Sequence, residues 1–202
     1  GYADLNLGAG VKPVLEAMEI AGGGRFRSVR HTCSWDAFEP LRSHRSGYPG
    51  MMASANFKEG FGVLTGMGYG FDALVYHPQI LELAELANAF PNATFILNHI
   101  GRPLGIGPYA GHRDEVFEVW KKDITTLAER PNIVVKVGGL GNRVSGFDWD
   151  TRPFPPSSTE LAKTTGPYYL HAIETFGPER CMFESNFPVD KALSLIHLSE
   201  ST

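Results

Sequence analysis

Short apolar runs that alternate with helical patterns constrain this chain more than any other feature of its sequence. Five runs have the length and the β-branched or aromatic character of buried strands: Phe26–His31, Ala73–His77, Thr94–His99, Ile133–Val137 and the run that begins at Cys181. Continuous apolar runs are typical of parallel strands that are covered on both faces. Because helical patterns separate the runs, the sequence predicts an α/β fold built on a parallel sheet.

The clearest helical pattern spans Arg113–Glu129, where apolar residues recur on one side. Other helices are expected at Val11–Ile20, Phe57–Met67 and Gln79–Ala89. A last helix should run from about residue 159 to 176, with a break or bend at Gly166-Pro167. No Gly-x-Gly-x-x-Gly follows a strand, which argues against a dinucleotide site.

Composition and charge exclude several classes of partner. The net charge of −4 is spread along 202 residues, without the basic stripe that nucleic-acid binding needs. No apolar run approaches the roughly 20 residues of a membrane span. Cys33 and Cys181 match no zinc or redox spacing and are interpreted as reduced thiols. We therefore expect a cytoplasmic protein that acts on a small molecule, and the sequence leaves a homo-oligomer open.

Polar side chains stand at the ends of the apolar runs, at Arg30, His77, His99, Lys136 and Glu184. In a parallel barrel all of these ends face one mouth, which is where barrel enzymes have their active sites. Any one of these residues could equally make a capping contact or a surface ion pair. Their recurrence at five strand ends predicts a site. Lys136 ends an apolar strand, so it should pair with a carboxylate or with substrate.

Two of these strand ends carry motifs. Leu97–Pro103 is an apolar strand followed by His-x-Gly-x-Pro, and Glu184–Pro188 reads Glu-Ser-Asn-Phe-Pro. Both resemble amidohydrolase family 2, the TIM-barrel hydrolases that include 2-pyrone-4,6-dicarboxylate lactonase and the sugar-acid lactonases. The resemblance covers most of residues 26–191 and implies a (β/α)8 TIM barrel. Since five strands are visible where eight are needed, it implies a partial barrel over residues 1–192, without the strand that normally carries His-x-His.

The two ends of the chain favour the interpretation that it is a C-terminal fragment of a longer protein. It begins at Gly1 without an initiator Met and stops at Thr202, soon after the last strand. Residues 193–202 resemble the translation of a transposon mosaic end used in sequencing libraries, so we expect a non-native tail. The leucine spacing of this segment also fits the start of a closing helix.

The resemblance implies roles for several residues. In the family, the histidine that matches His99 polarises a carbonyl or holds a metal, and Arg30 resembles an arginine that binds substrate. A guanidinium suits a substrate carboxylate because it can bind both oxygens. We also assign substrate binding to His77, Lys136 and Arg102.

The last motif departs from the family at two positions. Relatives have Gly-Ser-Asp-Trp/Phe-Pro, and their Asp is the general base that activates water, a role that the amide of Asn186 cannot take. Glu184 should share a strand face with Asn186. We therefore predict that Glu184 supplies the missing carboxylate and Asn186 orients substrate. The alternative is that Glu184 pairs with Lys136 inside the barrel and has no catalytic role.

The resemblance implies a hydrolase that opens a lactone or a related C–O or C–N bond of a small carboxylate-bearing substrate. A metal-dependent decarboxylase of the same family, a lyase, is the first alternative, and an inactive truncated barrel is the second. A divalent Zn or Mn ion is compatible with the family, with His99 as its one identified ligand. Because the usual Asp is absent, we expect catalysis without a metal.

Overall fold

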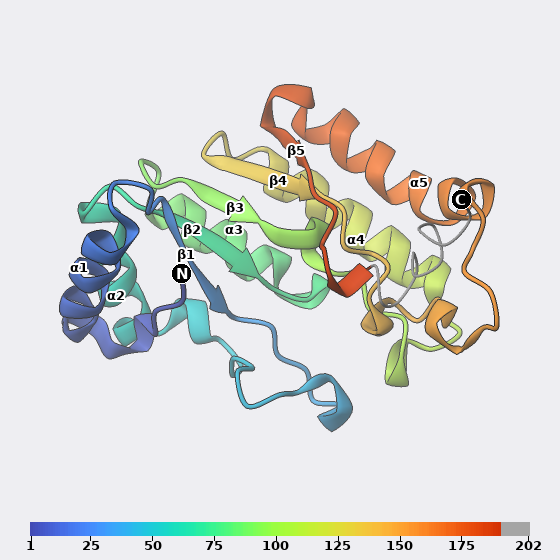
Figure 1. The fold of residues 1–202 in the computed structure, drawn as a ribbon, viewed down its shortest axis with the longest axis horizontal. Coiled ribbons are helices and arrows are strands. Elements are labelled where there is room, and N and C mark those ends of the chain that lie inside the picture. Colours follow the sequence, from blue (N-terminus) through green and yellow to red (C-terminus); the bar gives the residue numbers. More distant parts are fainter. Residues whose placement is uncertain (191–202) are drawn as a thin grey trace.

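The computed structural model describes residues 1–190, in which helices and strands alternate (Figure 1). Two elements, a 3-10 helix at Leu5–Val11 and helix α1 at Lys12–Gly22, precede the sheet. The strands are β1 Ser28–Thr32, β2 Gly70–Leu74, β3 Phe95–Leu97, β4 Ile133–Val137 and β5 Cys181–Phe183. The connecting helices are α2 Ala55–Gly66, α3 Ile80–Ala89, α4 Arg113–Ala128 and α5 Ser158–Phe176.

All five strands pair in parallel, in the order β1-β2-β3-β4-β5. Each neighbouring pair in the sheet is also consecutive in sequence, as in one section of a β/α barrel. The predicted α/β class and the predicted alternation are therefore confirmed. The foreign tail expected at residues 193–202 lies outside the described residues.

Two strand boundaries that matter for the site, and the continuity of one helix, differ from the prediction. Strand β2 begins at Gly70 and ends at Leu74, about three residues earlier than expected, so it contains Asp72. Strand β5 ends at Phe183, which leaves Glu184 and Asn186 beyond the strand. Helix α5 is continuous, with Pro167 inside it. Of the break or bend expected at Gly166-Pro167, the break is absent, because the packing of the helix outweighs the local cost of proline.

The hydrophobic core lies between the sheet and helices α2 to α5. Alternate strand residues face it and are fully buried, among them Val29, Phe71, Phe95 and Ile133. The aromatic rings of Phe61 and Phe95 stack at 5.1 Å in this core. Because side chains alternate along a strand, the other residues of the same strands point to the opposite face of the sheet. That inner face carries Ser28, Arg30, Asp72 and Lys136, and it lines a cavity.

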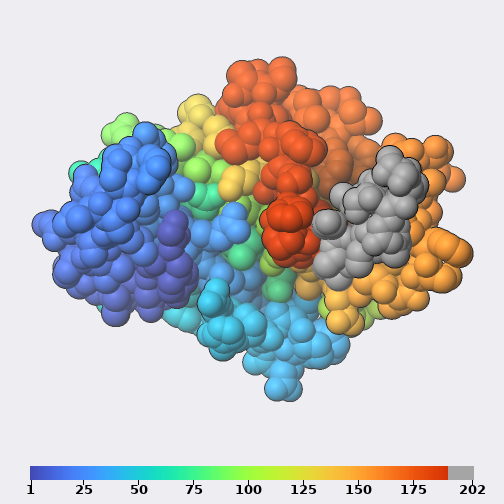
Figure 2. All heavy atoms as spheres, in the orientation of Figure 1, coloured from blue at the N-terminus to red at the C-terminus, as the bar shows by residue number. Residues whose placement is uncertain are grey.

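The segment between β1 and α2 leaves the sheet and runs along the lower edge of the molecule (Figures 1 and 2). It contains two short 3-10 helices, Glu39–Leu41 and Met51–Ala53. A smaller apolar cluster of Leu41, Tyr76 and Leu104 packs this segment against the loop that follows β3. The segment is therefore a packed part of the fold that borders the inner face.

Helix α4 is tied to the end of β3 by one buried hydrogen bond. The indole Nε1 of Trp120, which is fully buried, donates to the carbonyl of Ile100 at 2.7 Å. The carbonyl lies in the turn that carries His99, so this contact connects core packing to the strand end.

We predict that Trp120→Phe lowers the free energy of unfolding by about 1–3 kcal/mol, because it leaves the buried carbonyl of Ile100 without this donor. Urea denaturation measures the change. The matched control is Val119→Ala, since Val119 is exposed on the same helix and should change stability by no more than about 0.5 kcal/mol. Equal stability of the two variants would contradict a role for this hydrogen bond.

Candidate active site at the carboxyl ends of the strands

One group of polar side chains lies on the inner face of the sheet. Lys136 Nζ donates to Asp72 Oδ1 at 2.5 Å and to Asn98 Oδ1 at 3.0 Å. Arg30 Nη2 donates to the same oxygen of Asn98 at 2.7 Å and lies 4.0 Å from Asp72 Oδ1. The hydroxyl of Ser28 also donates to Asp72. We call this group the inner-face network.

The pKa of Asp72 follows from these contacts. Burial by itself would raise the pKa, but the hydrogen bonds from Lys136 and Ser28, together with the positive charges of Lys136 and Arg30, outweigh it and hold the pKa below its usual value. Asp72 is therefore a carboxylate at neutral pH. Lys136 does pair with a carboxylate, as its sequence context required. The alternative that it pairs with Glu184 is wrong.

Sequence reasoning missed Asp72 because β2 was expected to begin at Ala73. The signal was present, since one charged residue interrupts the apolar run from Gly70 to Tyr76. A buried charge in a strand needs a partner, and here the partners come from β1 and β4.

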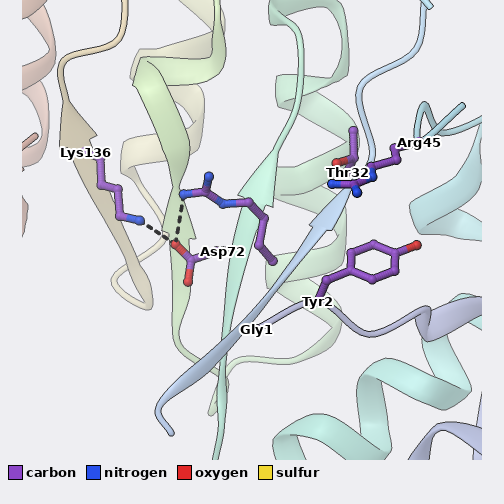
Figure 3. Close-up of a pocket in the computed structure, with 7 residues that line it drawn as sticks. Gly1, Tyr2, Thr32, Arg45, Asp72 and Lys136 are labelled. Carbon is purple, nitrogen blue, oxygen red and sulfur yellow. Dashed lines mark hydrogen bonds and ion pairs between the residues drawn. The ribbon is translucent and has the colours of Figure 1, made fainter. Parts of the chain in front are cut away.

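The inner-face network lines a cavity of about 450 Å³, which we call the interior cavity. Its lining residues are Gly1, Tyr2, Arg30, Thr32, Arg45, Asp72 and Lys136. Figure 3 shows Lys136 directed at Asp72 on one side, with Tyr2, Thr32 and Arg45 on the other. Three cationic side chains and one carboxylate give the cavity a net positive charge, which suits an anionic ligand.

A second polar group joins the ends of β3 and β5. Glu184 Oε1 lies 2.5 Å from Nδ1 of His99 and accepts a hydrogen bond from the backbone N–H of His99 at 3.1 Å. The His99 side chain is 3% exposed and the Glu184 side chain 15%. Glu184 also lines a second cavity of about 310 Å³, together with Trp149, Tyr169 and Asp190. Glu184 therefore borders this cavity, whereas His99 is not among its lining residues.

The backbone that carries His99 is strained. His99, Ile100, Gly101 and Arg102 all have positive φ, at 53°, 48°, 75° and 44°. A β-branched residue such as Ile100 rarely adopts this conformation. Strain of this kind persists where surrounding contacts over-determine it, and it concentrates at functional sites. Here the contacts come from Glu184 and from Trp120.

Two glycines after β4 make room for the pair. A Cβ on Gly139, which has φ +81°, would lie 2.2 Å from Nδ1 of His99. A Cβ on Gly138 would lie 2.3 Å from the carbonyl oxygen of Glu184. The Gly138-Gly139 pair is thus the condition under which His99 and Glu184 can meet beside β4.

Asn186 does not share a strand face with Glu184. It follows the end of β5 with φ 48°, so the alternation of a strand does not reach it. Its side-chain N–H donates to Asp190 Oδ1 at 2.7 Å. Burial raises the pKa of Asp190, while this hydrogen bond and the charge of His99 oppose the rise. The structure brings Asp190 to the same cavity as Glu184.

Arg102 lies between the two polar groups. Its Nε is buried and has no hydrogen-bond partner among residues 1–190. Burial lowers its pKa, and its charge interacts with those of Arg30, Asp190 and Glu184. Arg102 lines neither cavity, so this guanidinium donor is an unsatisfied buried polar group of the described residues.

His77 lies apart from both cavities. It is 4% exposed, its Nδ1 accepts from the backbone N–H of Leu104, and its backbone N–H donates to the carbonyl of Arg102 at 3.3 Å. Its ring meets that of Tyr109 edge-on at 5.2 Å. His77 therefore supports the turn that carries Arg102, and it does not line the interior cavity where a substrate contact was expected.

Within residues 1–190, no three His, Cys, Asp or Glu side chains form a group that could hold a metal ion. His99 is committed to Glu184, and Asp190 to Asn186. The described residues therefore do not by themselves make a metal centre. No helix in the same range is long and apolar enough to cross a membrane.

A parallel sheet of β/α units with a His–Glu pair and cations near the carboxyl ends of its strands is the architecture of one section of a β/α barrel. Residues 1–193 match the Amidohydro_2 family, described as amidohydrolase. The chain belongs to this amidohydrolase family. The resemblance seen in the two sequence motifs is therefore confirmed.

Three similar proteins are compared with the chain, and two of them are named as lactonases. The chain is 36% identical over 194 residues to the uncharacterized protein y4mH of Sinorhizobium fredii, across 96% of this chain and 57% of that protein. It is 26% identical to the L-rhamnono-gamma-lactonase of Scheffersomyces stipitis, across 93% of this chain and 54% of that enzyme. The L-fucono-1,5-lactonase of Burkholderia multivorans is 26% identical, across 67% and 43%. The chain thus spans little more than half the length of the first two relatives.

Solved structures agree with the fold. A crystal structure of an amidohydrolase from Burkholderia multivorans with bound zinc has a TM-score of 0.69 at 26% identity, across 96% of this chain and 59% of that one. The 2-pyrone-4,6-dicarboxylic acid hydrolase from Pseudomonas putida, described as putative, has a TM-score of 0.57 at 19% identity, across 88% and 53%. The chain is a partial (β/α)8 barrel, as predicted.

We predict that Gly139→Ala destabilises the protein by at least about 2 kcal/mol more than Gly111→Ala. Both glycines have φ near +80°, so both variants incur the left-handed cost of about 1–2 kcal/mol. Gly111 has open space around it, whereas Gly139 faces His99. Denaturant unfolding measures the difference, and imidazole NMR signals of His99 should move in Gly139→Ala alone. Equal losses of stability in the two variants, with unchanged His99 signals, would contradict the close approach of Gly139 to His99.

The stability of the protein should depend on pH through His77. Burial lowers the pKa of His77 to about 4, against about 6.5 in the unfolded chain. The unfolded state therefore binds more protons between these values, so stability is lost as pH falls from 6.5 towards 4. The loss from this one residue should reach about 2–3 kcal/mol at pH 4.5.

His77→Gln should remove this component, because glutamine does not titrate in this pH range. We expect the variant to lose about 2–3 kcal/mol less than the wild type between pH 7 and pH 4.5. Urea denaturation at the two pH values measures it. His112→Gln is the control, because His112 is exposed and its substitution should leave the pH dependence unchanged. Identical acid sensitivity of wild type and His77→Gln would refute the shift.

Proposed function

We propose that this chain carries the acid–base site of a lactone-opening hydrolase that acts on a small carboxylate-bearing substrate. The observation that carries the proposal is the Glu184–His99 pair, with its carboxylate on a cavity at the strand ends. Membership of the amidohydrolase family and the lactonase names of two relatives support it. No feature of the described residues favours the decarboxylase.

Glu184 acts as the general base in this proposal. His99 holds Oε1 of the carboxylate through its backbone N–H and its ring Nδ1, which leaves Oε2 for water. Glu184 takes a proton from this water while the hydroxide forms a bond to the lactone carbonyl carbon. The ring C–O bond then breaks, and the leaving ring oxygen takes the proton back from Glu184.

His99 is then a positioning residue. Its side chain is 3% exposed, which is too little for the contact with the substrate carbonyl that the resemblance implied. His99 fixes the orientation of the Glu184 carboxylate. The hydrogen bond between its Nδ1 and Oε1 can persist when Glu184 takes up a proton from water.

Cations stabilise the negative charge that develops. The Nε of Arg102 is buried and the residue lines neither cavity, so Arg102 acts on the developing oxyanion through its positive charge, which also interacts with Glu184 and Asp190. Arg30 and Lys136 line the interior cavity and bind the substrate carboxylate. Asn186 acts through Asp190, whose carboxylate it holds.

The test is hydrolysis of L-rhamnono-γ-lactone, L-fucono-1,5-lactone and 2-pyrone-4,6-dicarboxylate by the complete protein, followed through the released proton. We expect Glu184→Gln to lower kcat by roughly 10²–10⁴. His99→Asn should cost less than Glu184→Gln, because an amide can still donate to the carboxylate, and it should shift the pH profile. Glu174→Gln is the control, since Glu174 is exposed on α5.

Three outcomes would overturn parts of this proposal. Hydrolysis of none of the three substrates by the wild type would refute lactonase activity and favour an inactive barrel. Near-full activity of Glu184→Gln would move the base to Asp190, which Asp190→Asn then tests. The same assay with and without a chelator tests the expectation that a metal is dispensable, and loss of activity with the chelator would refute it.

A further inference from the structure

We propose that Arg45 is a specificity-determining residue that binds an anionic group of the substrate, a carboxylate, at the outer end of the interior cavity. The proposal deepens the proposed function, on which it rests for the reaction. Its binding test does not depend on hydrolysis. Arg45 lies in the long segment between β1 and α2, in which the sequence analysis predicted no site residue, and the contacts of this segment place Arg45 at the cavity.

Side chains of α3 and of the turn before it hold both ends of this segment. The amide of Gln79 accepts from the backbone N–H of Trp35 at 3.4 Å and donates to the carbonyl of Trp35 at 2.6 Å. At the other end, Glu82 Oε1 accepts from the backbone N–H of Met52 at 2.8 Å. The segment therefore leaves and rejoins the body of the protein at fixed points.

Two phenol groups hold the first half of the segment. The hydroxyl of Tyr76 donates to the carbonyl of Leu41 at 2.8 Å, and this contact is buried. The hydroxyl of Tyr109 donates to Asp36 Oδ2 at 2.7 Å. Only the part from about residue 42 to residue 50 remains mostly exposed.

The exposed tip has a defined turn. Ser43 and Ser46 close it, with the backbone N–H of Ser43 donating to Ser46 Oγ at 2.8 Å and that of Arg45 donating to Ser43 Oγ at 3.2 Å. Gly47 then packs on Cys33, where a Cβ would lie 2.7 Å from the carbonyl oxygen. This close return sets the tip against the end of β1, so the backbone of Arg45 is positioned beside the cavity.

Arg45 is the uncommitted cation of the interior cavity. Arg30 and Lys136 already bond to Asn98 and Asp72. Among residues 1–190, no hydrogen bond or ion pair is recorded for the side chain of Arg45, although it lines the same cavity. Figure 3 shows it beside Thr32, across the cavity from Lys136. A guanidinium in this position can bind both oxygens of a carboxylate.

The two sides of the cavity thus offer two anion contacts. Arg30 and Lys136 take one carboxylate near Asp72, and Arg45 takes a second anionic group near Tyr2 and Thr32. A substrate with two anionic groups uses both sides, whereas a neutral sugar lactone uses neither charge. The side chain at position 45 therefore discriminates by charge.

The experiment measures binding of glutarate, a dicarboxylate, and of its neutral analogue glutaramide by calorimetry with the complete protein. We expect Arg45→Gln to weaken glutarate binding about tenfold, which corresponds to about 1.4 kcal/mol, and to leave glutaramide unchanged. Arg45→Lys should restore part of the affinity. Arg42→Gln is the matched control, because it removes the same charge from the same loop at a residue that does not line the cavity.

No binding of glutarate by the wild type overturns the proposal, as does an equal loss in Arg45→Gln and Arg42→Gln. In kinetics, Arg45→Gln should raise KM for 2-pyrone-4,6-dicarboxylate with kcat retained, and should leave both sugar lactones unaffected. A wild type that binds glutarate through Arg45 but opens no lactone supports this inference and refutes the proposed function, so the two failures are distinguishable.

Discussion

The contact between Glu184 and His99 is the interaction on which the arrangement of the strand ends depends. The two residues are 85 positions apart and meet across β4. The contact needs the left-handed turn after β3 and the absence of side chains at Gly138 and Gly139. Trp120 secures the same turn from the core side. Packing energy from the helices thus sustains a strained backbone at the site, which is how strain is usually maintained in proteins.

The inner face follows a different physical rule. Asp72 and Lys136 are largely removed from water, and the desolvation of two such charges is repaid only when their hydrogen bonds are satisfied. Asn98 and Ser28 supply the remaining bonds to these two groups. Removal of one partner would leave the other charge buried and unpaired. The network therefore keeps a polar surface on one face of a sheet whose other face is apolar apart from His31, and it positions Arg30 at the cavity.

Much of the fold was predictable because its signals are local. Apolar runs and helical periodicity depend on neighbouring residues, and they located all ten helices and strands of the alternation. The predictions of site residues were wrong where they depended on the exact end of a strand. The expected start of β2 at Ala73 excluded Asp72, and the expected length of β5 placed Asn186 on a strand that ends three residues earlier. The family motifs identified His99 and Glu184, but not that they bond to each other.

The sequence by itself determined the α/β class, the order of the elements and the positions of the polar residues at the strand ends. Tertiary structure decided the partners: Lys136 bonds to Asp72, Glu184 to His99, and Asn186 to Asp190. The reason is that secondary structure follows from periods of two and 3.6 residues along the chain. Pairing of charged groups depends on strand register, on backbone conformation and on the space left by glycines, and these are set only when distant segments pack together.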